Sequence, residues 1–381
     1  MSQTHKMLFT TVASLCLLGC GGEELVDSSA PVAAVSTPTP SPTPSPTPTP
    51  TPATSSADGF VQAAKVKSGL NLDDWLVDHS IPVSAAPDVV GAFRFLCAPS
   101  HLAYDDPIVH KGKPGAAHLH QFFGNTKANA FSTYESLRTD GDSTCTNVLN
   151  RSAYWMPALL DGQGSVLVPR HVAIYYKRRP ESDKWFTDNK LKAAVIPRGL
   201  SYVFGGDDMK PQFKCVDVWT PIAVSESMTT ALAQCEPGQK FTVSLSAPDC
   251  WDGKNLQTTD NRSHVRHELR DGPRTYCPSS HPFVLATFTM TIEWSIEHGD
   301  TPNLWRFSSD MNGAAPGSTF HADWFGAWED EVLDMWHDGC IDELLNCSDG
   351  DLGMGKLMRR NNLYPSDQYT RKVAVHSIPK G

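Results

Sequence analysis

The clearest periodic pattern in the chain is an alternation of apolar and polar positions over residues 287–296. Phe288, Met290, Ile292, Trp294 and Ile296 are each separated by one Thr, Glu or Ser. A period of two places the apolar set on one face of a strand and the polar set on the other. Segments 166–176, 213–219 and 241–246 are also apolar and lie between Gly, Pro and Asp turn signals. The pattern therefore predicts four strands.

Helical spacing occurs only near the C-terminus. Apolar residues there recur every three or four positions, at Trp324, Trp328, Val332, Met335 or Trp336, Ile341, Leu344 and Leu345. Gly339 interrupts this run and is predicted to end a first helix. Because strands dominate, we expect a mainly β protein: one large β-sandwich-like domain with one or two C-terminal helices.

The first 58 residues are expected to lie outside that domain. Lys6 and the apolar run at 7–18, too short to span a bilayer, predict a lipoprotein-type signal peptide over residues 1–20. Its end, Leu17-Leu18-Gly19-Cys20, resembles a bacterial lipobox with lipidation at Cys20; an ordinary signal peptide with a chance cysteine is the alternative. Residues 21–58 are a predicted stalk, because proline at every second position from 38 to 52 favours extended polyproline geometry. Residues 59–381 form the domain.

Charge and cysteine content narrow the class of protein. The chain has 42 Asp and Glu against 32 Lys and Arg, a net charge of -10, so no chain-wide basic field favours nucleic acid as a partner. An even number of cysteines in an exported chain predicts four disulfides and an extracytoplasmic location. Only local pairs are assigned from spacing, Cys340 with Cys347 and Cys250 with Cys277. The eight cysteines of the domain are Cys97, Cys145, Cys215, Cys235, Cys250, Cys277, Cys340 and Cys347.

Two histidine-containing clusters are candidates for chemistry. His118 and His120, within residues 114–124, would share one face of a strand, as paired metal ligands or a catalytic pair do. His321 and Asp323 would share a face in the same way. The alternatives are two hydrogen-bonded histidines at a strand edge and, for Asp323, the N-cap of the predicted helix. If both clusters converge, three nitrogens and one oxygen would suit zinc or another divalent transition metal.

Two further clusters suggest acid and base chemistry. Asp249 and Asp252 flank Cys250 and Trp251, which would place two carboxylates beside an indole plane suited to a sugar. Asp252 followed by Gly253 is also an ordinary turn signal. His264 follows this cluster. His281, at the start of the strongest predicted strand, is either a proton shuttle or a hydrogen-bonded structural histidine.

Taken in order, these clusters resemble the secreted family called domain of unknown function nineteen-ninety-six, found in fungi, often beside carbohydrate-binding WSC modules, and in bacteria. The resemblance covers residues 93–340. One departure is that residues 110–113 intervene before Pro114-Gly115, where the family usually has proline and glycine soon after Ile-Val. The residues that carry the resemblance are Arg94-Phe95-Leu96-Cys97, Asp106-Pro107-Ile108-Val109, His118-x-His120 with Gly124, Ser152-Ala153-Tyr154-Trp155-x-Pro157, Pro248-Asp249-Cys250-Trp251-Asp252-Gly253-x-Asn255-Leu256, Ser263-His264, Cys277-Pro278-x-x-His281-Pro282 and His321-Ala322-Asp323 followed by Gly326-x-Trp328.

The resemblance implies an extracellular carbohydrate-active or cell-wall-associated protein, and it supplies no reaction. The expected lipid on Cys20 would anchor this protein to a membrane. Our first hypothesis is a polysaccharide hydrolase or lyase with Asp252 and His120 as the working pair. Its other candidate catalytic residues are Asp249, Asp323, His118, His264, His281 and His321, and its candidate substrate-binding residues are Tyr154, Trp155, Trp251, Asn255 and Trp324. The alternative is a non-catalytic glycan- or wall-binding lipoprotein, whose stacking platforms would come from Trp155, Trp251, Trp305, Trp324 and Trp328.

Overall fold

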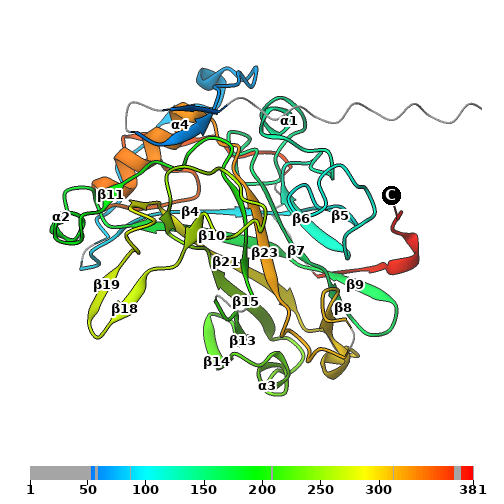
Figure 1. Cartoon of the computed structure of the whole chain (residues 1–381). Helices are drawn as coiled ribbons and strands as arrows, with labels where there is room; N and C mark the ends of the chain where they lie inside the picture. The colour runs from blue at the N-terminus through cyan, green and yellow to red at the C-terminus, as the bar shows by residue number, and fades with distance from the viewer. Residues whose placement is uncertain are drawn as a thin grey trace, which may run out of the picture. The chain divides into compact units, whose positions relative to one another are not determined.

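The computed structural model describes residues 59–380, except 86, 207, 208, 312 and 364–369, together with the backbone of residues 53–55 (Figure 1). The predicted signal peptide, Cys20 and most of the predicted stalk lie outside the described residues. Strands dominate the described part of the chain, and its helices are short. The prediction of a mainly β fold is confirmed.

The larger of two main sheets has seven strands, in the order β14-β13-β15-β21-β10-β4-β24 (Figure 1). Neighbours are antiparallel, except that β24 runs parallel to β4. On β21 the alternation is confirmed, because Phe288, Met290, Ile292 and Trp294 are buried and the intervening residues are half-buried. The strands are β4 (Gly91–Cys97), β10 (His171–Arg178), β13 (Gln212–Asp217), β14 (Thr220–Ser225), β15 (Lys240–Ser246), β21 (Thr287–Ser295) and β24 (Asn346–Ser348).

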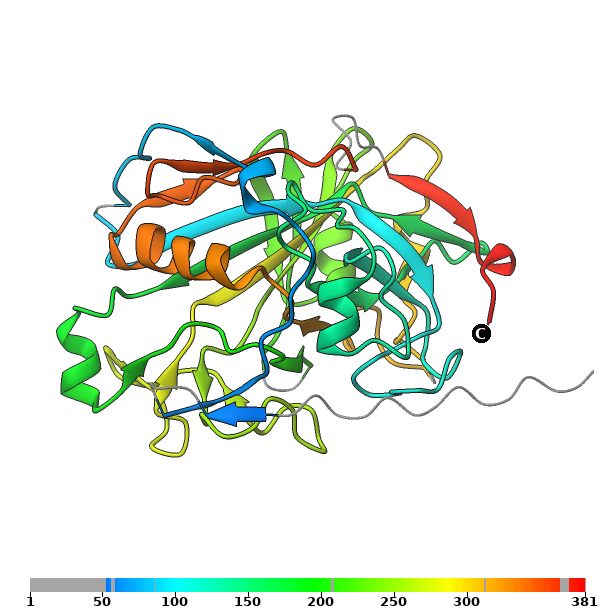
Figure 2. The same cartoon turned by 90° about the horizontal axis from the view of Figure 1, so that it is seen from above.

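A five-stranded sheet, in the order β12-β23-β7-β6-β5, packs against the seven-stranded one. Tyr154 and Trp324 from this sheet contact Phe288 of β21 at ring-centroid distances of 6.1 and 5.5 Å. The two sheets therefore share one aromatic core, as in a β-sandwich. Figure 2 gives the view of the fold from above. The strands are β5 (Pro99–Ala103), β6 (His120–Gly124), β7 (Ala153–Pro157), β12 (Ser201–Gly205) and β23 (His321–Phe325).

The opposite face of the five-stranded sheet carries a different set of side chains. Val203, Asp323, Trp155 and Phe122 lie opposite one another across the four strands β12, β23, β7 and β6. Because side chains alternate along each strand, His120 and His321 lie on this same face. A small separate core formed with residues such as Ile108, Ala128 and Leu137 covers part of it. The face that bears the predicted histidines thus points away from the main core.

Smaller sheets complete the domain. The predicted strand at 166–176 is two strands in different sheets, because Pro169 lies between them and cannot donate a ladder hydrogen bond. The remaining strands are β11 (Lys192–Ala193), β20 (Phe283–Val284), β16 (Cys250–Trp251) and β17 (Val265–Arg266) in one sheet; β22 (Arg306–Phe307), β8 (Leu159–Leu160), β9 (Ser165–Val168) and β26 (Arg371–Ala374) in another; and the pairs β1 (Ala53–Ser55) with β2 (Val61–Ala63), β3 (Leu76–Asp78) with β25 (Lys356–Met358), and β18 (Leu269–Asp271) with β19 (Arg274–Tyr276).

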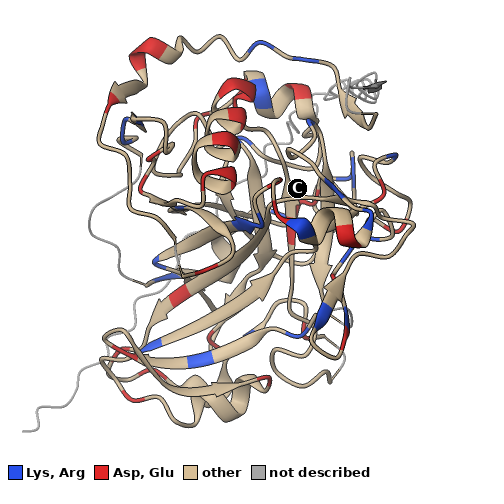
Figure 3. Cartoon of the chain, turned by 90° about the vertical axis from the view of Figure 1, so that its left-hand side faces the viewer, with Lys and Arg blue, Asp and Glu red and all other residues tan. Residues whose placement is uncertain are grey.

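The predicted C-terminal helix begins later than expected. It is α4 (Asp330–Trp336), and the π-helical segment His337–Asp342 continues it. Trp324 belongs to β23, and Glu329 is the N-cap, so the N-cap role considered for Asp323 is wrong. Gly339 lies within the π-helical segment rather than ending a helix. The other helices are α1 (Tyr134–Thr139), α2 (Lys184–Asn189) and α3 (Met228–Leu232), with single 3-10 turns at Leu72–Asp74, Pro302–Leu304 and Val375–Ser377. Acidic residues recur along α4, whereas the strands carry fewer charges (Figure 3).

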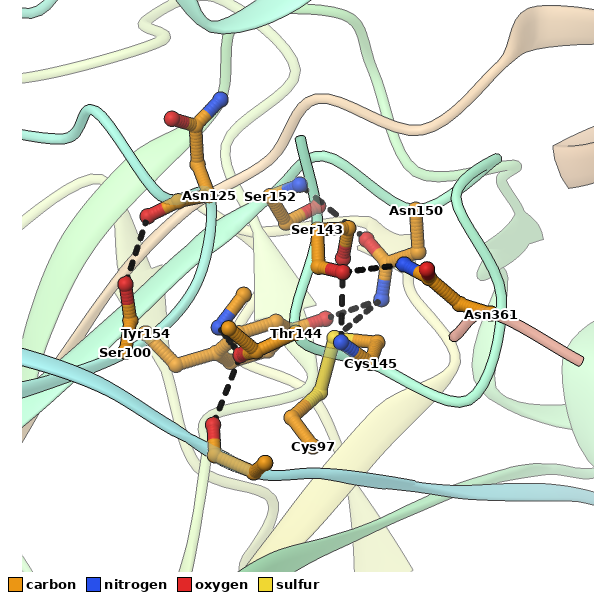
Figure 4. Close-up of a disulfide and its surroundings, with 12 residues drawn as sticks. Cys97, Ser100, Asn125, Ser143, Thr144, Cys145, Asn150, Ser152, Tyr154 and Asn361 are labelled. Atoms are coloured by element: carbon orange, nitrogen blue, oxygen red, sulfur yellow. Dashed lines mark hydrogen bonds between the residues drawn. A yellow bond between two sulfur atoms is a disulfide. The ribbon is translucent and has the colours of Figure 1, made fainter. Parts of the chain in front are cut away.

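All eight cysteines of the domain are paired, in four disulfides. Both predicted pairs, Cys340 with Cys347 and Cys250 with Cys277, are confirmed. A third joins Cys97, at the end of β4, to Cys145, where Thr144 Oγ1 donates to the Ala98 carbonyl at 2.6 Å (Figure 4). The fourth joins Cys215 and Cys235. Disulfides of this number indicate an extracytoplasmic protein. Among the described residues, no helix is long and apolar enough to cross a membrane.

Candidate metal centre

Three histidines from distant parts of the chain meet where strands β6 and β23 of the five-stranded sheet begin. His120 begins β6 and His321 begins β23, and β7 alone separates these strands. His118 precedes β6, with its ring centroid 4.2 Å from that of His120 and 5.2 Å from that of His321. One nitrogen from each ring lies within 4.8 Å of the others. The three histidines therefore meet, which is the condition that the metal hypothesis set for them.

Backbone carbonyls fix the orientation of two of these rings. Nδ1 of His120 donates to the Asp105 carbonyl and Nδ1 of His321 to the Thr319 carbonyl, each at 2.9 Å. Since a carbonyl only accepts, Nδ1 must carry the hydrogen and Nε2 the lone pair. Among the described residues, Nε2 of His120 and Nε2 of His118 are buried without a hydrogen-bond partner. Metal-binding histidines are oriented by such contacts at the second ring nitrogen.

Two carboxylates hold the loops that supply these carbonyls. Asp105 accepts the backbone N–H groups of Gly115 and Ala130 at 3.0 and 3.1 Å. Asp310 is buried and accepts the N–H groups of Phe307 at 2.9 Å, Gly317 at 2.7 Å and Thr319 at 3.3 Å. Neither residue was a sequence candidate. Each acts on a histidine through a loop, and the only sequence signal is an aspartate among turn-forming residues.

The surroundings keep all three imidazoles neutral. Burial, with the neighbouring His321 and His110 adding to it, lowers the pKa of His118 to about 4. Burial also holds the pKa of His120 well below its ordinary value and lowers the pKa of His321. A neutral imidazole keeps the lone pair that a metal ligand needs. The cluster is therefore ready to bind a cation without first losing protons.

Asp323 adds a carboxylate to this edge. It is fully buried, Oδ2 lies 3.8 Å from His321 Nε2, and among the described residues neither oxygen has a hydrogen-bond partner. Burial, followed by the nearby Asp106, raises its pKa well above the ordinary value, and Arg262 opposes this. A buried carboxylate without donors is costly unless a cation compensates it. His118, His120 and His321, with Asp323 beside them, could hold a metal ion.

The distances indicate how far the rings would move. Nitrogens bound to one tetrahedral zinc at about 2.0–2.1 Å lie about 3.3 Å apart. The donor atoms of the three histidines lie within 4.8 Å of one another, so shifts of about 1.5 Å or less would close the shell. Side-chain rotation supplies movements of this size.

The preferred pair of Asp252 and His120 is not brought together. Asp252 follows β16 in a separate four-stranded sheet, and no contact between the two residues is found in the described part of the chain. Its Oδ1 accepts the N–H groups of Lys254 and Asn255 at 2.8 and 3.0 Å, and its Oδ2 accepts Asn255 Nδ2 at 2.7 Å. Asp252 and Asn255 therefore build a turn, which was the alternative considered from the sequence.

Three other candidates hold the chain near β16 and β17. Both ring nitrogens of His264 are occupied, by Thr258 Oγ1 and the Ser201 carbonyl, each at 3.0 Å. Those of His281 contact Ser280 Oγ at 2.8 Å and the Ser263 carbonyl at 2.9 Å. Asp249 accepts the N–H of Glu268 at 3.0 Å, and burial, then the Glu268 charge, raises its pKa well above the ordinary value. Both ring nitrogens of His264 and of His281 thus take part in hydrogen bonds within the fold.

The expected stacking aromatics are core residues. Tyr154 donates to or accepts from Tyr176 Oη at 3.1 Å inside the shared core, and Trp324 packs there on Tyr202. Trp251 packs between Phe60 and Phe283. Trp155 lies on the histidine face, stacked on Phe122. Because their rings are sealed from solvent, the platform role is corrected for Tyr154, Trp155, Trp251, Trp305, Trp324 and Trp328, all at most 3% exposed.

A hollow of about 330 Å³ lies beside the strand that pairs with β23. Gly205, which lines it, is the strand partner of His321. Arg262 also lines it and donates from Nη1 to the Gly205 carbonyl at 2.8 Å. The hollow therefore provides room for a bound molecule next to the strand end that carries the third histidine.

Comparison with known proteins gives one match. Residues 106–328, more than half of the chain, match the family model described as Domain of unknown function (DUF1996), within the range covered by the sequence resemblance. The matched segment contains His118, His120, His321 and Asp323. No curated protein and no solved structure matches the chain. The chain belongs to the DUF1996 family.

Proposed function

We propose that this chain is an extracytoplasmic, metal-dependent hydrolase that cleaves a polysaccharide. The observation that supports the proposal most is the orientation of His120 and His321, whose Nδ1 atoms donate to carbonyls so that their Nε2 lone pairs face the same small volume. Simple structural histidines, such as His264, use both nitrogens in hydrogen bonds instead. Three neutral imidazoles are the donor set of catalytic zinc sites that keep a further position for water.

Each residue of the site has a distinct role in this proposal. His118, His120 and His321 would hold the ion, and zinc is the first choice because its sites favour imidazole nitrogens in tetrahedral geometry. A bound divalent ion acts as a Lewis acid and lowers the pKa of a coordinated water. Asp323, 3.8 Å from His321, would then take the proton of that water or serve as a fourth ligand. Asp105 and Asp310 would hold the loops whose carbonyls orient His120 and His321.

The substrate class and the location rest on the sequence. The family resemblance places such domains beside carbohydrate-binding modules, so a glycan is the proposed substrate. Lipidation at Cys20 and the proline-rich segment would hold the domain at a distance from the membrane surface, facing polymers outside the cell. An enzyme that cleaves such a polymer needs metal-binding histidines and a carboxylate at its site. It does not need the open aromatic platforms that a purely glycan-binding protein would use.

Product analysis tests the proposal. The purified full-length protein, metal-depleted and then reloaded with zinc, is incubated with plant, fungal and bacterial polysaccharides, and soluble products are weighed by mass spectrometry. We expect products carrying added water from the zinc-loaded wild type and none from the metal-depleted protein, with His120→Ala and Asp323→Asn inactive. Asp252→Asn and the exposed His298→Ala are matched controls that should keep activity.

Three results would overturn the proposal. Unsaturated product ends would mean a lyase, and oxidised ends would mean a redox metal site. Absence of products from every polymer, with the protein retained on an insoluble glycan, would favour a non-catalytic glycan-binding protein.

A further inference from the structure

The outer face of the seven-stranded sheet forms a hollow of about 620 Å³ that the metal site does not use. Strands β4, β10, β13, β15 and β21 contribute to its walls. Four basic residues line it, Arg94, Lys177, Lys210 and Lys214, and none of its described lining residues is acidic. In a chain with a net charge of -10, this concentration of basic side chains in one hollow favours an anionic ligand. We call this hollow the basic groove.

Hydroxyl groups form rows across the floor of the basic groove. Ser244 Oγ lies 3.0 Å from Thr291 Oγ1, and Ser246 Oγ lies 3.1 Å from Thr289 Oγ1. On the neighbouring strands Thr289 is paired with Tyr175 and Ser244 is paired with Gln212. A hydroxyl has one donor and two acceptor positions, so each pair keeps hydrogen-bonding capacity toward a ligand. The floor can therefore bind a molecule that is itself rich in hydroxyls.

An aromatic ring holds two of the cations in place. Lys177 Nζ lies 4.6 Å from the centroid of the Tyr175 ring, and Arg94 Cζ lies 5.6 Å from it. Lys177 also lies 3.8 Å from a carboxylate oxygen of Asp88, whose side chain is 66% exposed. An exposed ion pair of this kind is weak and leaves most of the positive field in place. The two cations are thus positioned without being neutralised by a buried acid.

We propose that the basic groove binds an acidic polysaccharide, a chain of sugars that carry carboxylates. The cations match the carboxylates, and the Ser and Thr rows match the sugar hydroxyls. A single-stranded nucleic acid would need free aromatic faces for base stacking, but two cations cover the ring of Tyr175. This inference rests on the proposed function for its link to catalysis, because it names the substrate class of the same enzyme.

The basic groove also adjoins the hollow beside the metal centre. Met209 lines both, and the second hollow includes Gly205, the strand partner of His321. A polymer held in the basic groove could therefore pass over Met209 toward the strand end that bears His321. The groove would hold the chain while a neighbouring segment reaches the histidines.

Binding of polygalacturonate to the full-length protein, measured by affinity electrophoresis and calorimetry, tests this inference. Fully methyl-esterified polygalacturonate is the matched neutral polymer. We expect binding only to the acidic form, weakening as salt rises. The Lys177→Gln/Lys214→Gln variant should lose about tenfold or more in affinity, since two of four cations are removed. Lys254→Gln, which replaces an exposed lysine in the turn after β16, should bind as wild type does.

Other outcomes would overturn the groove. These are no binding of polygalacturonate or alginate, equal binding of the esterified polymer, tighter binding of single-stranded DNA, or unchanged affinity in the double variant. Zinc content and hydrolysis are measured on the same samples. If the protein fails to bind the polymer but has the expected zinc content, only the groove proposal is overturned. If it binds the polymer but shows no zinc-dependent cleavage, the proposed function is overturned and the groove proposal stands.

Discussion

The rings of His118 and His321 lie 5.2 Å apart and perpendicular to each other, although about two hundred residues separate them in the chain. Strand order accounts for the meeting, because β6 and β23 both pair with β7. The same order puts His120 and Asp323 on the face that points away from the main core. The sheet thus brings candidate ligands from both ends of the family domain to the same end of its strands.

Asp310 is expected to tune metal affinity without touching the metal. Asp310→Ala removes the acceptor of three N–H groups in the loop that supplies the Thr319 carbonyl to His321. Loss of a residue that orients a metal-binding histidine typically costs about 10–100-fold in metal affinity. Zinc competition titrations should show this loss, with a smaller one in Asp310→Asn. An Asp310→Ala protein that is folded by near-ultraviolet circular dichroism and binds zinc with wild-type affinity would exclude this role.

Asp323 is expected to release a proton when a cation binds. Its pKa is raised above the ordinary value, so at pH values between the two the metal-free carboxyl is protonated, and a bound cation displaces that proton. Calorimetry in buffers of different ionisation enthalpy, at a pH inside this range at which the three histidines are neutral, should give about one proton released per zinc. Asp323→Asn should release none beyond what the histidines contribute. Equal release from both proteins would show that Asp323 does not face the metal.

His337 is expected to make the protein sensitive to acid. It is fully buried beside Trp336, neither ring nitrogen has a hydrogen-bond partner in the described part of the chain, and burial lowers its pKa well below the ordinary value. Since the unfolded state binds a proton first, near pH 6.5, the free energy of unfolding falls as pH drops below that value. The fall from this group is up to about 1.4 kcal/mol per pH unit.

Urea unfolding at pH 7.5 and 5.5 measures this effect. His337→Phe, which keeps a ring beside Trp336, should show a smaller loss of stability between the two pH values than wild type. Wild-type pH dependence in His337→Phe would mean that this residue is not the group responsible.

Asp252→Asn tests whether Asp252 is a turn residue or a catalytic residue. An asparagine keeps one oxygen to accept the N–H groups of Lys254 and Asn255, so the turn should persist with a stability loss of about 1 kcal/mol or less. Zinc content and any product formation should equal those of wild type. Loss of activity in a zinc-loaded Asp252→Asn protein would restore Asp252 as a catalytic residue.

The sequence indicated the candidate metal-binding residues more clearly than the residues that hold them in place. Alternation on β21 is readable because one face of that strand is buried and the other is wet. The spacing of His118-x-His120 and of His321-x-Asp323 likewise predicted that each pair shares one face. That the two pairs lie close together depends on the order of the strands in the sheet, which the sequence does not show. The helix was misplaced because Trp324 and Trp328 have helical spacing, but Trp324 lies in a strand and Trp328 forms a β-bridge with Asn150.

The roles of the tryptophans and of the two aspartates that hold the histidine loops could not be predicted from the sequence. An indole ring packs in a core as well as it stacks on a sugar, so composition does not separate Trp251 in the core from a binding platform. Asp105 and Asp310 act through backbone carbonyls on loops, and a loop carries no periodic pattern. Their roles depend on where Thr319 and Asp105 place their carbonyls, which only the folded chain determines.

Zinc stoichiometry tests the central claim most directly. The purified full-length protein is stripped with a chelator, dialysed against zinc, and measured by elemental mass spectrometry beside the His118→Ala/His120→Ala/His321→Ala and His298→Ala variants. The account predicts one zinc per chain in wild type and in His298→Ala, and none in the triple variant. A wild-type protein without zinc or any other divalent transition metal, or a triple variant that still retains one per chain, would contradict it.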